Sequence, residues 1–198
     1  MKSIVVVSVA LLLFVISPAD AQRVQGQLQL YNDESGVDCI IQDMSGIVTV
    51  YVYFFDYFSN DRILAVQFGA PLPDCWPGAI WLGDTSPWLT SIGDSQLNDP
   101  SGWSIAFGEC QIPPVFVGSI IYLSQGLAPT CCPYPVVKAA DGHPEIPMPV
   151  GAACSEPDPV LIGIEAGTSY INGDHTCPCI WPVPVQEKTW GGIKSLYR

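Results

Sequence analysis

Short runs of β-branched and aromatic residues are separated along this chain by 19 prolines and 18 glycines. Stretches with the apolar period of an α-helix are almost absent. Proline and glycine at this density interrupt helices, whereas both residues fit the turns between short strands. The pattern therefore predicts an all-β domain, because antiparallel sandwiches and barrels are built from short runs of this kind.

The run at 47–57 is the clearest of these strands. One face carries Val48, Val50, Val52 and Phe54. The opposite face is also largely apolar and contains Ile47, Thr49, Tyr51, Tyr53 and Phe55. A strand that is apolar on both faces is typical of the middle of a sheet, so we predict a central strand here.

Similar runs predict further strands at 27–31, 37–42, 62–68, 79–82, 88–92, 103–107, 115–123 and 136–139. We expect about eight to ten strands in an immunoglobulin-like or cohesin-like antiparallel β-sandwich with a disulfide-rich C-terminal extension. Residues 22–198 have a length that suits one domain with a sizeable core. Within them, residues 22–139 would form the sandwich core.

The sequence changes character after residue 139. X-Pro pairs end at Pro144, Pro147, Pro149 and Pro159, and they discourage both helix and regular strand pairing. We predict an ordered loop held by cysteines, followed by a hairpin of 160–165 and 168–171 around Gly167. Residues 140–186 would then form a Pro/Cys-rich extension packed on the sandwich, and residues 187–198 a basic amphipathic tail.

The first 21 residues have the three parts of a secretory signal peptide. Lys2 precedes an apolar stretch at 4–16, and Ala19 and Ala21 supply the small residues that signal peptidase recognises before Gln22. The stretch is shorter than the roughly 20 apolar residues of a membrane-spanning helix. We therefore expect a secreted, cell-surface or periplasmic protein that has no membrane span after signal removal.

The charge of the chain is strongly negative, −12 at pH 7. Between Arg62 and Lys188 the sole Lys or Arg is Lys138. Nucleic acids and anionic membrane surfaces bind through clustered Lys and Arg, so both classes of partner are excluded. The acidity favours solubility and carries no information about the fold.

The chain contains an even number of cysteines, eight, which in an exported protein indicates disulfides. Neighbouring cysteines seldom pair with each other, because a disulfide needs Cα atoms about 5–6 Å apart and converging side chains. We therefore expect the members of each cluster to pair with distant partners. The predicted disulfide residues are Cys39, Cys75, Cys110, Cys131, Cys132, Cys154, Cys177 and Cys179.

No arrangement of residues predicts a catalytic site. Gly93-Asp94-Ser95 is similar to the nucleophile block of one esterase family, but an Asp three residues before His143 or His175 is missing. A turn is the better interpretation. His175 with Cys177 and Cys179 lacks the usual spacing of zinc ligands, so we predict no metal there.

Acidic turns at 32–34, 98–99 and 172–174 present oxygen ligands that suit calcium. None of them matches the twelve-residue calcium loop, and Asx and Gly residues are common in turns without a metal. We expect no cofactor, with structural Ca²⁺ as the alternative.

Four tryptophans, Trp76, Trp81, Trp88 and Trp103, lie close together in the sequence. Exposed on a sheet they would bind a carbohydrate or protein ligand, and they are the candidate ligand-binding residues. The alternative, which is commoner for an indole and which we favour, is that they fill the core.

The sequence ends in Trp-Gly-Gly-Ile-Lys-Ser-Leu-Tyr-Arg. This ending resembles the Trp-Gly-x-Ile-Lys-Ser-Leu-Tyr-Arg segment of a loosely defined group of exported bacterial β-sandwich proteins. The segments 105–111 and 171–173 are also similar to sequences of that group. The group has no established activity. The resemblance implies an exported module whose tail is recognised by export or surface machinery; packing of the tail on the domain is the alternative. The tail residues concerned are Trp190, Ile193, Lys194, Leu196, Tyr197 and Arg198.

Together these features predict an exported, non-catalytic module for surface adhesion, assembly or ligand binding. A secreted polysaccharide-active hydrolase is one alternative, because the spacing of a carboxylate pair in space is not visible in sequence. A self-associating subunit of a surface layer is another.

Overall fold

A computed structural model of the chain describes residues 24–56, 62–155 and 157–177. The predicted signal peptide (1–21), Cys179 and the basic tail (187–198) lie outside the described residues. The regular elements within the described ranges are twelve strands, so the all-β prediction is confirmed. In the same ranges, no helix combines the length and hydrophobicity needed to cross a bilayer.

The strands agree with most of the predicted runs. Their bounds are β1 (Val24–Tyr31), β2 (Ile40–Ile41), β3 (Gly46–Phe55), β4 (Ile63–Phe68), β5 (Ile80–Thr85), β6 (Thr90–Ile92), β7 (Trp103–Gln111), β8 (Val115–Ser124), β9 (Cys132–Pro135), β10 (Val150–Ala153), β11 (Val160–Ala166) and β12 (Thr168–Ile171).

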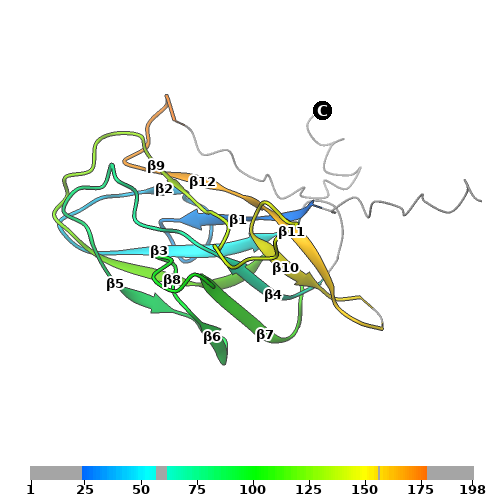
Figure 1. The fold of residues 1–198 in the computed structure, drawn as a ribbon. Coiled ribbons are helices and arrows are strands. Elements are labelled where there is room, and N and C mark those ends of the chain that lie inside the picture. The colour runs from blue at the N-terminus through cyan, green and yellow to red at the C-terminus, as the bar shows by residue number, and fades with distance from the viewer. Residues whose placement is uncertain (1–23, 57–61, 156, 178–198) are drawn as a thin grey trace, which may run out of the picture.

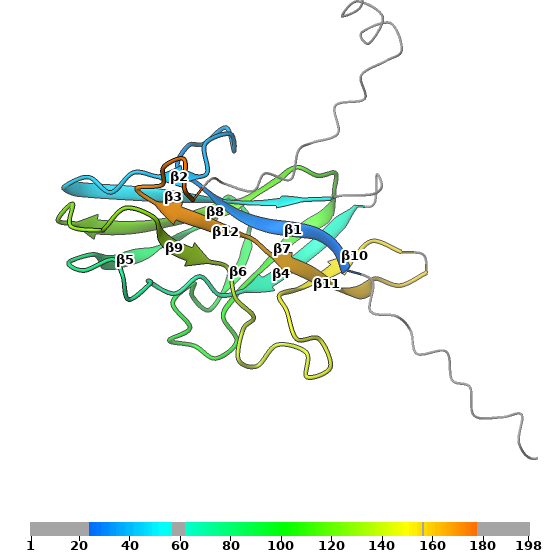
Figure 2. The same cartoon turned by 90° about the horizontal axis from the view of Figure 1, so that it is seen from above.

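Nine strands form one sheet in the order β5-β8-β3-β1-β11-β10-β4-β7-β6, and β2, β12 and β9 form a second sheet. The large sheet folds over on itself, so that β5, β8, β3 and β1 lie in one layer and β10, β4, β7 and β6 in the other (Figures 1 and 2). The layers meet closely, because a Cβ built on Gly118 of β8 would lie 2.7 Å from the Trp103 ring of β7. The predicted sandwich is confirmed.

The expectation of purely antiparallel pairing needs a correction. β1 pairs with β11 in parallel, and β12 pairs with β2 in parallel, whereas the other strand pairs are antiparallel. Parallel neighbours need a long crossover instead of a hairpin. The local patterns that predict hairpins contain no signal for such pairs.

The hairpin predicted for 160–165 and 168–171 is also wrong. β11 belongs to the large sheet and β12 to the small one, and Gly167 stands between them. The Gly167 N–H donates to the Leu28 carbonyl, and its own carbonyl accepts from Val136. A Cβ at this position would lie 2.1 Å from Oε1 of Gln29, so glycine is required where the chain passes from one sheet to the other.

The region after residue 139 contributes strands to the large sheet, whereas the sequence predicted an extension packed on the sandwich. β10 lies within the proline-rich segment, and β10 and β11 stand between β4 and β1 in the large sheet. In place of the strand predicted at 136–139, the structure has a single β-bridge between Gly69 and Val137. The observed strand, β9, lies just before this segment. β9 and β10 are only four residues long, which is too short for alternation to identify them in the sequence.

β3 is a central strand, as predicted, because it pairs with β1 on one side and β8 on the other. Its inward side chains are buried in a core shared by both layers and the small sheet. Large fully buried side chains of this core are Trp76, Trp103, Tyr122, Tyr134, Phe54, Phe68, Leu28 and Leu30.

Disulfides join segments that are distant in sequence. Cys75 is bonded to Cys132, Cys110 to Cys154 and Cys131 to Cys177. Cys39 is also a disulfide cysteine, and no described cysteine is free. The prediction that Cys131 and Cys132 bond to distant partners is confirmed.

Candidate functional site

A shallow hollow lies on the outer surface of the layer formed by β10, β4, β7 and β6. Strand register builds its floor. Ala65 of β4 stands opposite Ala106 of β7 and opposite Ala152 of β10. Ala106 in turn faces Thr90 of β6, and Ala152 faces Leu161 of β11. Three alanines therefore form a low floor between two larger side chains.

A second row of residues runs beside the first. Gln67 of β4 stands opposite Val150 on one side and Ser104 on the other, and Ser104 faces Ile92. The exposed fractions of Ile92 and Leu161 are 59% and 54%, so these two residues form apolar walls. The hollow has a volume of about 330 Å³.

The local sequence explains which side chains face outward here. Val66 and Ile105 are buried in the core, so that their neighbours in β4 and β7 point to the other side of the sheet. Those neighbours are small or neutral. None of the residues that line the hollow is ionisable: Ala65, Val66, Gln67, Thr90, Ile92, Ser104, Ile105, Ala106, Val150, Gly151, Ala152 and Leu161.

The four candidate tryptophans do not form one exposed face. Trp76 and Trp103 are core residues with exposed fractions of 2% and 1%. Their indole N–H groups donate to Ser124 (3.2 Å) and Ser91 (2.8 Å). The placement of these two follows the core alternative that the sequence favoured.

Trp81 and Trp88 are half-buried against the core. The Trp81 indole donates to Asp84 at 3.0 Å, and the Trp88 indole donates to the Phe116 carbonyl at 2.9 Å. Neither of them lines the hollow.

Ser95 of the predicted turn at Gly93-Asp94-Ser95 belongs to a partly buried polar network. Ser95 is fully buried, and both its N–H and its hydroxyl donate to the Asp84 carboxylate, at 2.6 and 2.8 Å. Gln96 donates to the Tyr122 hydroxyl at 2.8 Å and accepts from the Leu72 N–H at 2.7 Å. Ser95 is therefore held inside the fold and is inaccessible as a nucleophile.

Burial raises the pKa of the Asp84 carboxyl, and the nearby Asp94 charge adds to this, although hydrogen bonds from Ser95 and Trp81 oppose it. The folded chain thus binds this proton at a higher pH than the unfolded chain does. The resulting stability is present at acidic pH and is lost as the pH rises through the raised pKa.

We therefore expect the wild type to gain stability relative to Asp84→Asn as the pH falls from neutral toward the ordinary range of Asp. Urea unfolding of both proteins across this window measures the difference. Asp99→Asn is the control, because hydrogen bonds from Ser101 lower the pKa of the exposed Asp99. Relative to Asp99→Asn, the wild type should lose stability as the pH falls. If the difference in unfolding free energy changes with pH in the same direction for Asp84→Asn and Asp99→Asn, the raised pKa of Asp84 is contradicted.

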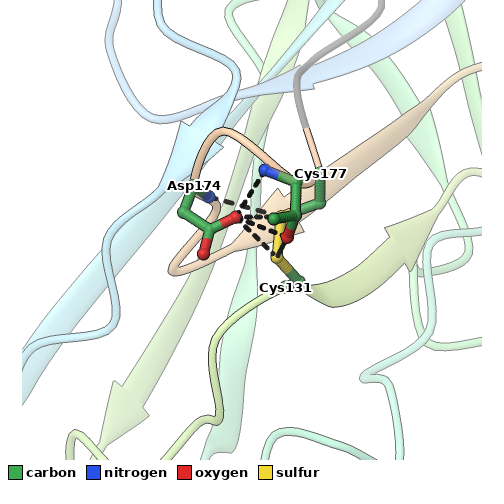
Figure 3. Close-up of a disulfide and its surroundings, with 4 residues drawn as sticks. Cys131, Asp174 and Cys177 are labelled. Atoms are coloured by element: carbon green, nitrogen blue, oxygen red, sulfur yellow. Dashed lines mark hydrogen bonds between the residues drawn. A yellow bond between two sulfur atoms is a disulfide. The ribbon is translucent and has the colours of Figure 1, made fainter.

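Cys131, Asp174 and Cys177 form the one cluster among the described residues that has the composition of a metal site. Figure 3 shows Asp174 directed at the bonded sulfur atoms, with Oδ1 3.3 Å from Sγ of Cys131. Because both sulfurs are in a disulfide, neither is a thiolate that a metal can bind. The N–H and hydroxyl of Thr176 donate to the same carboxylate oxygen, at 2.7 and 2.6 Å.

The acidic turn at 32–34 is likewise explained by local hydrogen bonds. The Asp33 carboxylate accepts from the backbone N–H groups of Ser35, Val37 and Asp38. These bonds form an Asx-type turn. Both carboxylate oxygens of Asp33 are thus bonded to the backbone of its own turn.

Comparison with known proteins gives likenesses of structure alone. No protein-family model matches the chain, and no curated protein matches its sequence. The structure is similar to a cohesin module from the family 33 glycoside hydrolase of Clostridium perfringens ATCC13124, with 8% identity and a TM-score of 0.45. The match covers 77% of this chain and 100% of that one.

Two further cohesins are similar. One is the seventh ScaB type I cohesin of Pseudobacteroides cellulosolvens, with 12% identity and a TM-score of 0.38 over 75% of this chain and 94% of that one. The other is the third ScaC cohesin of Acetivibrio cellulolyticus, solved in complex with the ScaB dockerin. It has 10% identity and a TM-score of 0.33 over 73% of this chain and 99% of that one.

Proposed function

We propose that this protein is an exported, non-catalytic module that binds a protein partner through the hollow on β10, β4, β7 and β6. The observation that carries the proposal is the floor of Ala65, Ala106 and Ala152 beside the exposed apolar side chains of Ile92 and Leu161. An open apolar surface of this kind on a folded domain typically marks an interaction site.

The chemistry of the lining favours binding over catalysis. A hydrolase needs acids, bases or nucleophiles at the cleft, commonly with perturbed pKa values. The lining contains no ionisable residue, and the partly buried carboxyl of Asp84 lies in the separate network with Ser95 and Gln96. The hydrolase alternative therefore has no support at this site.

The same lining favours a protein over a carbohydrate as the partner. Sugars bind by stacking on aromatic rings and by dense hydrogen bonding, and the lining has no aromatic ring. A small apolar floor instead accepts one or two projecting apolar side chains, which commonly dominate the affinity of protein interfaces. Gln67, Thr90 and Ser104 can supply polar contacts beside them.

Export fits the oxidised cysteines, because stable disulfides are typical of secreted and cell-surface proteins. Adhesion and assembly at the cell surface are the roles that we infer for such a module. The sequence of the ending, which resembles that of a loosely defined group of exported bacterial β-sandwich proteins, supports this proposal.

Blocking the floor tests the function. A photo-crosslinking residue at Thr90 should capture a partner from the exported fraction of the native cells, whereas the same residue at exposed Thr130 should not. The captured protein is then purified, and its affinity for the wild type and for the variants is measured by titration. We expect Ala106→Arg to weaken its binding roughly 100-fold, because a large charged side chain fills the site, and Thr130→Arg to leave binding unchanged.

Three results oppose this function. Equal binding by wild type and Ala106→Arg would remove the hollow from the interface. A cross-linked product of twice the chain's mass would favour the self-associating surface-layer subunit. Binding of a polysaccharide that Ala106→Arg abolishes would replace the protein partner.

A further inference from the structure

A second apolar surface lies on the opposite layer of the sandwich, on the outer side of β3 and β8. Tyr51, Tyr53 and Phe55 project from alternate positions of β3, and Phe116 of β8 stands opposite Tyr53. Ring centroids are 5.3 Å apart for Tyr53 and Phe116 and 6.3 Å apart for Tyr51 and Phe116. All four rings are half-buried. We call this surface the outer aromatic face.

Aliphatic residues extend this face toward the beginning of β3. Ile47 of β3, Leu123 of β8 and Ile80 of β5 are in register across three strands. Their exposed fractions are 60%, 43% and 58%. The face therefore continues as an apolar surface along the length of β3.

Negative charge borders the aromatic end. The Tyr53 hydroxyl donates to the Glu34 carbonyl, so the acidic turn at 32–34 lies against the ring. Burial raises the pKa of the Tyr53 hydroxyl, and the charges of Glu34 and Asp33 raise it further. A cationic, partly apolar segment matches this combination of rings and carboxylates.

The described chain ends close to the other end of the face. Asn172 accepts from the Asp43 N–H at 2.9 Å and donates to the Ala128 carbonyl at 2.9 Å. Asp43 precedes β3 and Ala128 follows β8, so the segment that leads to Cys177 lies where β3 begins and β8 ends. The bond from Cys177 to Cys131 fixes it there.

The sequence beyond Cys177 has the length and the charge to cover the face. Its 21 residues can reach roughly 70 Å when extended, whereas ten residues of strand span roughly 33 Å. The described residues contain fifteen Asp and Glu against Arg62 and Lys138. Residues 178–198 carry Lys188, Lys194 and Arg198 against Glu187 alone.

We propose that residues 178–198 bind the outer aromatic face of their own domain. Trp190, Ile193 and Leu196 supply the apolar contacts, and the basic residues lie beside Asp33 and Glu34. The sequence beyond Cys177 thus acts as an intramolecular cover of this face, independently of the hollow on the opposite layer.

Hydroxyl-radical footprinting of the oxidised chain 22–198 tests this binding. The test variant is Trp190→Ser with Ile193→Ser and Leu196→Ser, which keeps the length and charge of the tail. We expect oxidation of Tyr51, Tyr53 and Phe116 to rise about threefold in this variant, and that of Ile92 and Leu161 in the hollow to stay unchanged. In the parent chain, Trp190 should be oxidised about threefold more slowly than in the isolated peptide 187–198.

A second variant tests the charges. Glu34→Lys should raise the oxidation of Trp190, whereas Glu109→Lys, at an exposed position on β7, should not. Equal oxidation of the three rings in parent and triple variant would overturn the proposal, as would a Trp190 that reacts as fast as in the free peptide. Protection that disappears on dilution would also overturn it, because it would assign the face to a second copy of the chain.

Discussion

Replacing Cys75 and Cys132 together by alanine is expected to lower the free energy of unfolding by about 4 kcal/mol. The two cysteines are 57 residues apart, and a bond that closes a loop of this length removes much conformational entropy from the unfolded chain. Guanidinium unfolding under non-reducing conditions, with intact mass to verify the remaining bonds, measures the loss.

The pair Cys110 and Cys154 is the matched control. Its separation is 44 residues, and loop entropy depends on the logarithm of the length, so its removal should also cost about 4 kcal/mol. Cys132 is buried, whereas Cys110 is exposed. A much larger loss for the Cys75–Cys132 pair would contradict the entropic account and assign the stabilisation to packing.

Trp103→Ala should likewise destabilise the fold by about 4 kcal/mol, because truncation of a fully buried aromatic side chain leaves a cavity. The Trp103 ring packs on Phe68, with 5.6 Å between centroids, and closes against Gly118 in the facing layer. Thermal and chemical unfolding measure this loss.

Trp103→Phe provides the comparison for this site. It keeps most of the buried area and removes the 2.8 Å hydrogen bond to Ser91, so we expect a loss of about 1–2 kcal/mol. A ligand-binding role for Trp103 without a core role predicts instead that both variants retain the stability of the wild type.

Local pattern was enough to predict most strands of this fold. The alternation in β3 correctly separates the core residues Val50 and Val52 from the outer Tyr51 and Tyr53, because the side-chain period of a strand is two wherever it lies. The turns rich in glycine and proline also place most strand ends within a few residues. What local pattern omits is the partner of each strand, as the parallel pair of β1 and β11 illustrates.

The hollow could not be predicted for the same reason. Its floor depends on the register that brings Ala65, Ala106 and Ala152 side by side from three distant strands. An alanine in the sequence of a strand does not indicate which residue of another strand will lie beside it. Small outward-facing residues occur in both β4 and β7, but they form a hollow only because the two strands pair side by side.

The sequence alone also did not decide whether Trp76 and Trp103 lie in the core or on a ligand-binding surface. Burying an indole requires a partner for its N–H, and Ser91 and Ser124 provide partners for Trp103 and Trp76. Those serines lie 12 and 48 residues away in sequence. The sequence therefore left both roles open for residues that the fold places in its core.

The adjacency of Cys131 and Cys132 has a mechanical consequence. A pulling force applied at Val24 and Cys177 can travel through the bond from Cys75 to Cys132, across one peptide unit, and on through the bond from Cys131 to Cys177. Tension therefore bypasses the chain between Cys75 and Cys131 and between Cys132 and Cys177, which includes β7, β8 and β10. While both disulfides are intact, force can unfold and extend only the residues between Val24 and Cys75. The extension of the domain under force is therefore limited to the length of that segment.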